Sequence, residues 1–217
     1  MPLPQSAGPA QAHPGVPAAP MAEDERLRVE FYLLLAHLLA RPPQAALLRQ
    51  IAALTDDEQT PLGVALNGLA QAAQTTSADA VENEFNLLFI GLGRGELLPY
   101  GSHYRSGFLH DKPLAALRQD LARLGVARVD DNPEPEDHVA ALCEVMAGMI
   151  AGIFGPAAVT AETASLCQEA LFRTHIESWM PQFFRDLETA EAAAFYRHVG
   201  RLGRVFMQIE AEAFTLA

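Results

Sequence analysis

Cysteine and basic side chains are scarce in this sequence of 217 residues. The two cysteines, Cys143 and Cys167, give neither a disulfide framework nor a metal cluster by themselves, and their scarcity fits a reducing compartment. Lysine and arginine total 15 against 27 acids, a formal net charge of -12. With so few cations to displace phosphate counterions, we expect no nucleic-acid partner, whereas a basic partner would suit this charge.

Long hydrophobic runs are also missing. The apolar run 31–40 is too short to span a bilayer and has charges just upstream, so we predict no membrane segment. Residues 1–20 contain six of the 15 prolines, no charged Asp, Glu, Lys or Arg, and neither the basic start nor the apolar centre of a secretory signal. We predict a disordered tail over 1–20 and one folded domain over 21–217, with Met1 and Met21 both open as the start.

Strand-like alternation is absent, and abundant alanine together with helical spacing of apolar residues predicts an all-α bundle of about eight to ten helices. The predicted helices cover 23–40, 44–54, 60–74, 78–90, 113–124, 136–154, 156–179, a short segment from Pro181, and 190–214. The last of these has an apolar stripe composed of Phe195, Val199, Leu202, Phe206, Ile209 and Ala213.

Two segments interrupt the helical pattern. Residues 91–106 are rich in glycine at their start and predict a long loop, of a length that is more often functional than not. Its glycines match neither the dinucleotide fingerprint nor the P-loop pattern. Residues 125–136 place two prolines among acids, and we interpret them as a connector.

The sequence Glu134-Pro135-Glu136-Asp137-His138 concentrates titratable groups at a predicted helix start. Acids at this position complement the helix dipole, which is one interpretation. In the other, a proline-stiffened turn presents carboxylates and an imidazole that hold a guanidinium through charge-assisted hydrogen bonds. Composition and spacing leave both interpretations open.

A metal site is the competing hypothesis. Histidine and carboxylate side chains are common metal ligands, and one alternative is a small helical metal-dependent enzyme that uses Asp137, His138 and His175. No pair shows the spacing of a known metal motif such as HExxH. We therefore expect no metal or other cofactor.

Several motifs in order resemble one family. Glu84-Phe85 followed by Leu88-Phe89-Ile90-Gly91 resembles an E-[YFW]-x-x-L-F-x-G signature, and Glu134–His138 matches an E-P-x-D-H hallmark. Further matches are Phe31–Leu35 with Pro42-Pro43, Pro99-Tyr100-Gly101-Ser102 with Tyr104, and the C-terminal residues His175, Trp179, Phe183, Phe195 and Tyr196. Over 25–210 the chain thus resembles the TorD/DmsD/NarJ family of redox-enzyme maturation chaperones, nearest the TorD/DmsD branch. It departs at Gly91-Leu92-Gly93, often Gly-Pro-Gly in the family, and at Tyr100, often Trp.

The resemblance implies a cytoplasmic, non-enzymatic, all-helical chaperone. Its partner would be the catalytic subunit of a molybdenum-cofactor enzyme, bound through the twin-arginine signal peptide until the subunit is mature. It also implies a monomer, or a domain-swapped dimer exchanged around a hinge at 125–136. A NarJ-like chaperone for an enzyme that is not exported stays open. The implied peptide-binding residues are Phe85, Leu88, Phe89, Pro99, Tyr100, Ser102, Glu136, Asp137 and His138.

A signal peptide with a basic start and an apolar helical stretch needs a carboxylate site beside an apolar groove. We predict that Glu136 and Asp137 supply the carboxylates. The groove is expected to comprise Phe85, Leu88, Phe89 and Tyr100.

Overall fold

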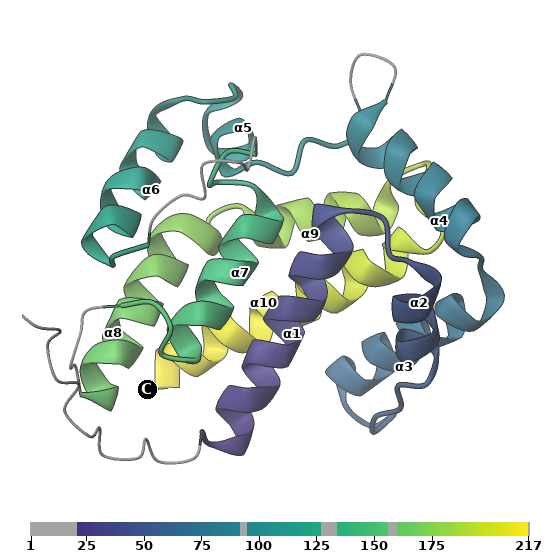
Figure 1. Cartoon of the computed structure of the whole chain (residues 1–217), viewed down its shortest axis with the longest axis horizontal. Helices are drawn as coiled ribbons and strands as arrows, with labels where there is room; N and C mark the ends of the chain where they lie inside the picture. Colours follow the sequence, from purple (N-terminus) through teal and green to yellow (C-terminus); the bar gives the residue numbers. More distant parts are fainter. Residues whose placement is uncertain (1–20, 92–94, 127–133, 156–159, 217) are drawn as a thin grey trace, which may run out of the picture.

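The computed structural model describes residues 21–91, 95–126, 134–155 and 160–216 (Figure 1). These residues form ten α-helices and two short π-helical segments, with no strand among them, so the all-α prediction is confirmed. The predicted tail, 1–20, and most of the predicted hinge, 125–136, lie outside the described ranges. In the part of the chain that is described, no helix is both long and apolar enough to cross a membrane.

The helices follow the chain with short connections. The α-helices are α1 Glu23–Ala40, α2 Ala45–Ala52, α3 Pro61–Thr75, α4 Ala78–Phe85, α5 Gly101–Ser106, α6 Lys112–Arg123, α7 Val139–Ile150, α8 Ala161–Leu171, α9 Met180–Thr189 and α10 Tyr196–Leu216. The π-helical segment η1, Asn86–Ile90, continues α4, and η2, Phe172–Ile176, continues α8.

Two pairs of neighbouring helices form the centre of the bundle. Helix α10 packs along α9 and also contacts α3 and α1, while α1 packs along α7 (Figure 1). The side chains of Tyr32, Trp179 and Tyr196 are among the fully buried residues of the core. Helices α5 and α6 lie at one end, above α7 and α8 in the view of Figure 1.

Local signals in the sequence set several helix ends correctly. The Thr60 hydroxyl accepts a hydrogen bond from the Gly63 N–H at 2.9 Å, with proline at the first helical position. Gly125 follows α6 with a φ of 73°, a left-handed conformation that glycine adopts without strain.

The predicted loop over 91–106 is wrong at its C-terminal end, where Gly101–Ser106 form α5. The Ser102 N–H donates to the Asp137 carboxylate at 2.6 Å, and the Gly101 N–H donates to the Asp137 carbonyl at 2.9 Å. A residue 35 positions away therefore satisfies the first N–H groups of this helix. Periodicity within the segment carries no signal of such a long-range cap.

Helix α7 begins at Val139 rather than near Glu136, because His138 acts as its N-cap. The helix ends at Ile150, and Gly152 follows with a φ of 68°. Ile153, inside the predicted range 136–154, therefore lies beyond the helix and is 73% exposed.

Predicted helix 156–179 also differs from the structure. Pro156 lies outside the described residues, and α8 begins at Ala161 after the Thr160 cap. The helical hydrogen bonding then passes into η2, so the segment is not one continuous α-helix.

The last helix begins at Tyr196, six residues later than predicted, because Glu84 caps it from α4. The Glu84 carboxylate accepts hydrogen bonds from the N–H groups of Ala194, Phe195 and Tyr196 at 2.8, 3.0 and 2.6 Å. The predicted stripe is right at its first four positions, but Ile209 is 39% exposed and Ala213 is exposed. Glu210 and Phe214 take their places on the buried face.

Glu210 is buried because it forms part of a polar network inside the bundle. Arg28 donates to both of its carboxylate oxygens, at 2.7 and 2.8 Å, and the Tyr32 hydroxyl donates at 2.9 Å. Arg28 also donates to the Gln168 side chain at 3.3 Å and lies over the Phe214 ring. This network connects α1, α8 and α10.

Candidate functional site

Two motifs far apart in the sequence meet in a short antiparallel bridge between Tyr100 and His138. The Gly101 N–H donates to the Asp137 carbonyl, and the Val139 N–H donates to the Pro99 carbonyl, both at 2.9 Å. The bridge holds the proline-aromatic segment against the start of α7. The structure therefore brings together two segments that the family resemblance assigned to one site.

Asp137 lies beneath this bridge and is 3% exposed. One carboxylate oxygen accepts from the Ser102 N–H, while the other, Oδ1, is buried and has no hydrogen-bond partner. Ser102 is buried as well, and its hydroxyl accepts from the His110 N–H at 3.2 Å. Asp137 thus positions α5 and does not present its carboxylate to solvent.

His138 is buried beside Asp137 and acts in its neutral form. Its Nδ1 accepts from the Ala140 N–H at 3.2 Å, so in the neutral ring the proton is on Nε2. Burial lowers the pKa of His138, against smaller opposing effects of Glu134 and Asp137. The ring meets Tyr100 edge-on, with the ring centres 5.1 Å apart.

The lowered pKa of His138 predicts that stability decreases with falling pH. Below an unfolded-state pKa of about 6.5, the unfolded chain binds a proton that the folded chain does not. We expect the wild-type protein to lose more free energy of unfolding between pH 7.5 and 5.5 than the variant His138→Asn, by up to about 1.4 kcal/mol. Urea unfolding at both pH values measures this difference.

His138→Asn is suitable for this comparison because asparagine is also a good N-cap. Burial also lowers the pKa of His198, and its contribution is common to both proteins. Equal losses in the two proteins would contradict the prediction.

A small pocket opens beside the bridge, between η1, the end of α1 and the start of α7. Its volume is about 180 Å³. The residues that line it are Leu39, Ala40, Phe85, Phe89, Ile90, Pro99, Tyr100, Glu134, His138, Ala140, Ala141 and Glu144. We call it the η1–α7 pocket.

Five of the nine predicted peptide-binding residues line the η1–α7 pocket, namely Phe85, Phe89, Pro99, Tyr100 and His138. The other four do not line it. Leu88 is fully buried in the core, and Ser102 and Asp137 are buried under the bridge. Glu136 forms an ion pair with Arg118 at 2.8 Å.

The acids on the η1–α7 pocket are Glu134 and Glu144, instead of the predicted Glu136 and Asp137. Glu134 accepts a hydrogen bond from the Tyr100 hydroxyl at 2.7 Å, and burial together with this bond raises the pKa of Tyr100. Glu144 is exposed on α7. A signal for it was present in the sequence, because Glu144 is the single charged residue in the helix VAALCEVMAGMI.

Aromatic rings of Phe85, Phe89 and Tyr100 line the η1–α7 pocket. The Phe89 ring centre lies 4.9 Å from Phe85 and 5.5 Å from Tyr196 in the core. On η1, Ile90 lines the pocket and is 60% exposed, whereas Leu87, 63% exposed, does not line it. Single-turn π segments within α-helices occur frequently at functional sites. The result is an exposed apolar edge beside two carboxylates.

His175 is held elsewhere and does not join Asp137 and His138. Its Nε2 lies 2.8 Å from the Asp120 carboxylate, and this contact is the main cause of the lowered pKa of Asp120. The His175 carbonyl accepts from the Trp179 indole at 2.6 Å, and Trp179 packs against Gly101. Among the described residues, no group of His, Cys, Asp and Glu could hold a metal ion. The alternative of a metal-dependent enzyme has no support.

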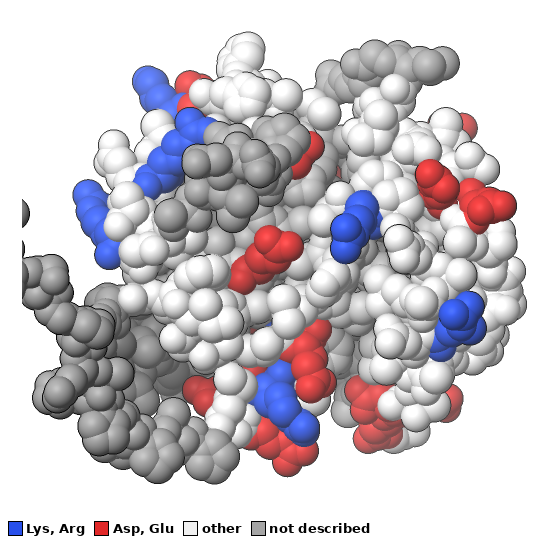
Figure 2. All heavy atoms as spheres, in the orientation of Figure 1, with Lys and Arg blue, Asp and Glu red and all other residues white. Residues whose placement is uncertain are grey.

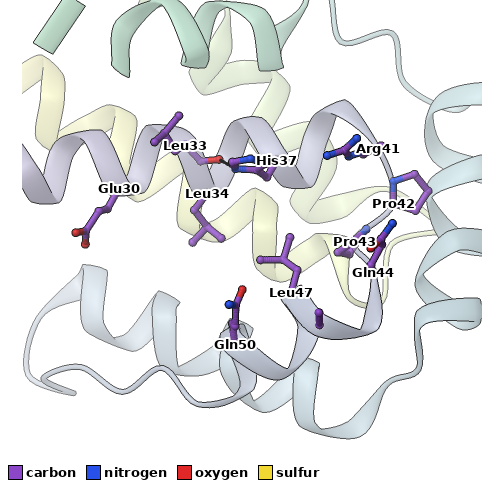
Figure 3. A pocket seen from close by; sticks show the side chains of 11 residues that line it. Glu30, Leu33, Leu34, His37, Arg41, Pro42, Pro43, Gln44, Leu47 and Gln50 are labelled. Atoms are coloured by element: carbon purple, nitrogen blue, oxygen red, sulfur yellow. Dashed lines mark hydrogen bonds between the residues drawn. The ribbon is translucent and has the colours of Figure 1, made fainter. Parts of the chain in front are cut away.

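A larger pocket of about 530 Å³ lies between α1 and α2 (Figure 3). Leu34 from α1 and Leu47 from α2 point toward one another across it, with Glu30 and Gln50 at one end and Arg41 at the other. None of the predicted peptide-binding residues lines this pocket. The motif residues therefore point to the η1–α7 pocket as the candidate site.

Comparison with known proteins gives curated relatives that are named chaperone protein TorD. The chain is 30% identical to the chaperone protein TorD of Vibrio parahaemolyticus over 132 residues, which are 59% of this chain and 61% of that protein. It is 29% identical to the Vibrio cholerae chaperone protein TorD over 127 residues, 58% of each chain. The chain thus spans about three fifths of the length of these curated relatives.

The fold also has a solved counterpart. A crystal structure from Archaeoglobus fulgidus, of a candidate redox enzyme maturation protein, superposes with a TM-score of 0.54 and 20% identity, covering 86% of this chain and 94% of that one. At this identity the likeness concerns the fold. Residues 55–185 match the model of the family described as nitrate reductase delta subunit. The chain therefore belongs to this family, that of the TorD and NarJ chaperones, as its motifs had indicated.

Proposed function

We propose that this protein is a non-enzymatic, cytoplasmic chaperone that assists the maturation of a molybdenum-cofactor oxidoreductase. Its partner is the catalytic subunit of that enzyme, bound through a twin-arginine signal peptide before export. The proposal is supported by membership of the family and by relatives named chaperone protein TorD. The observation that carries it is the η1–α7 pocket, in which aromatic side chains and two carboxylates lie together.

The chemistry of the η1–α7 pocket matches the two parts of such a peptide. The exposed side chain of Ile90 on η1 provides an apolar edge for the hydrophobic helical stretch. Glu134 and Glu144 provide charge for the arginines, whose planar guanidinium groups pair well with carboxylates. At about 180 Å³ the pocket is smaller than the roughly 300–1,000 Å³ of small-molecule sites, so it suits one peptide side chain.

The buried residues of the motif have a positioning role in this proposal. Asp137 caps α5, and through the bridge it fixes Tyr100 and His138 at the edge of the η1–α7 pocket. Leu88 supports η1 from the core. Substitutions at Asp137 and Leu88 therefore act on binding through the shape of the pocket, and they need a stability control.

Binding of a twin-arginine peptide by isothermal titration calorimetry tests the proposal. We expect Ile90→Ser and Glu144→Arg each to weaken the affinity about tenfold, because one loses apolar contact and the other repels arginine. Both side chains are exposed, so folding should be little affected. For a peptide in which both arginines are replaced by glutamine, the wild type and Glu144→Arg should bind with similar affinity.

Matched controls are available on the same segments. Leu87→Ser removes an equally exposed side chain of η1 that does not line the η1–α7 pocket, and Glu82→Arg reverses an exposed charge on α4. We expect both controls to bind like the wild type. Absence of binding to the wild-type protein, or equal weakening by the control variants, would refute the proposed site.

A further inference from the structure

The turn between α5 and α6 presents apolar side chains to solvent. Phe108 is 71% exposed and Leu109 is 42% exposed. Aromatic side chains are common anchors of protein interfaces, so an exposed Phe108 beside an exposed Leu109 is a candidate contact surface. We call residues 105–112 the α5–α6 turn.

Hydrogen bonds fix the conformation of the α5–α6 turn. The Ser106 hydroxyl donates to the Ser102 carbonyl at 2.8 Å, the Gly107 N–H donates to the His103 carbonyl at 2.8 Å, and the His110 N–H donates to the Ser102 hydroxyl. His110 has a φ of 60°, a strained conformation for a residue other than glycine. The turn is therefore preorganised, and little entropy is lost when it binds.

The segment 101–126, which contains the α5–α6 turn, has a net positive charge, opposite to that of the rest of the chain. Residues 101–126 contain four basic residues and two acids, although the chain carries a net charge of -12. Figure 2 shows lysine and arginine side chains gathered over α6, at the upper left, whereas acidic side chains are spread over the rest of this face. Arg118 and Arg123 are paired with carboxylates, whereas Arg105 and Lys112 are exposed on either side of Phe108 and Leu109.

The α5–α6 turn holds Arg105 and Lys112 and a single acid, Asp111, so its apolar pair lies in a net positive segment. This is the chemical complement of the η1–α7 pocket, which is lined by aromatic side chains and the acids Glu134 and Glu144. The turn cannot fold back into the pocket of its own chain. Tyr100, at the start of α5, lines the pocket, and the turn begins at the far end of this anchored helix, roughly 9 Å further on at 1.5 Å per residue. A second copy of the chain has no such restriction.

We propose that two copies of this chain associate reciprocally, with the α5–α6 turn of each copy seated in the η1–α7 pocket of the other. Such an interface is isologous and closes as a two-fold dimer. Each copy contributes Phe108 and Leu109 to the site of its partner. If the pocket binds the signal peptide as proposed above, self-association and peptide binding are mutually exclusive, and client peptide converts the dimer to monomers.

Sedimentation velocity of the full chain, from low micromolar concentration to the solubility limit, tests the association. The wild type is expected to show a reversible monomer–dimer equilibrium. Phe108→Ser, which alters the turn, and Glu144→Arg, which alters the pocket, should each weaken the dimer by about tenfold or more, as expected for the loss of an interface anchor. The controls Leu166→Ser and Arg49→Glu, at exposed positions on α8 and α2, should associate like the wild type. A wild type that stays monomeric, or Phe108→Ser and Glu144→Arg variants that associate as tightly as the wild type, would overturn the proposal.

Two further measurements separate the proposal from its alternatives. Binding of the wild type to vesicles of anionic lipid, lost in Phe108→Ser, would assign the turn to a membrane surface and overturn the proposal. A twin-arginine peptide that binds without dissociating the dimer would also overturn it, because turn and peptide would then use different sites. Failure of the peptide to bind, with the dimer and its variant pattern intact, would refute the proposed function and leave the self-association standing.

Discussion

Replacing Glu84 with alanine is expected to lower the free energy of unfolding by about 3–5 kcal/mol. The carboxylate is 7% exposed and accepts three backbone hydrogen bonds at the start of α10. Hydrogen bonds to a charged group are stronger than neutral ones, and the positive end of the helix dipole adds to them. Without the carboxylate, the buried N–H groups of Phe195 and Tyr196 lose their partner.

Urea unfolding monitored by circular dichroism measures the effect of Glu84→Ala. Glu82→Ala, at an exposed position two residues earlier in α4, is the matched control and should change stability by less than about 0.5 kcal/mol. Glu84→Gln retains one acceptor oxygen, so its loss of stability should lie between those of Glu84→Ala and Glu82→Ala. A loss below about 1 kcal/mol for Glu84→Ala would mean that water replaces the cap.

Glu210→Ala is the second substitution with a large expected effect, again about 3–5 kcal/mol. The Glu210 side chain is 1% exposed and Arg28 is 23% exposed, so the ion pair is largely removed from water. Alanine would leave the Arg28 guanidinium without its bidentate partner and the buried Tyr32 hydroxyl without an acceptor. Breaking a buried pair from one side is strongly destabilising for this reason.

Removing all three side chains of the network together should lower the free energy of unfolding far less than Glu210→Ala does. The triple variant Arg28→Met, Tyr32→Phe, Glu210→Leu replaces the ion pair and the hydroxyl by apolar groups of similar size, which in other buried pairs is often neutral. We expect it to recover more than half of the loss caused by Glu210→Ala, measured by chemical unfolding. A triple variant less stable than Glu210→Ala would show that packing, not unpaired charge, determines the loss.

Most helix positions follow from local patterns in the sequence. The bounds predicted for α1 agree with the structure, and the Thr60 and Gly125 signals set the ends of α3 and α6. These features depend on residues within one or two turns of each other, through side-chain caps, left-handed glycine and apolar spacing. A single sequence contains all of that information.

The errors at α5 and α10 share one physical cause, which is capping by residues remote in sequence. Glu84 caps α10 from 112 positions away, and Asp137 caps α5 from 35 positions away. The same long-range bonds take Asp137 out of solvent, and an ion pair with Arg118 engages Glu136. The carboxylates that the sequence pointed to are therefore not those that line the η1–α7 pocket.

By itself the sequence determined the helical class, most helix positions and, through its motifs, the family and five residues of the η1–α7 pocket. Only the tertiary structure decided which acids lie on that pocket, because Glu134 and Glu144 reach it from different segments. It also decided the burial of Glu84, Asp137 and Glu210, whose charged groups are stabilised by partners far along the chain. Hydrophobic patterning describes which side chains avoid water, but a buried charge depends on a specific partner in space.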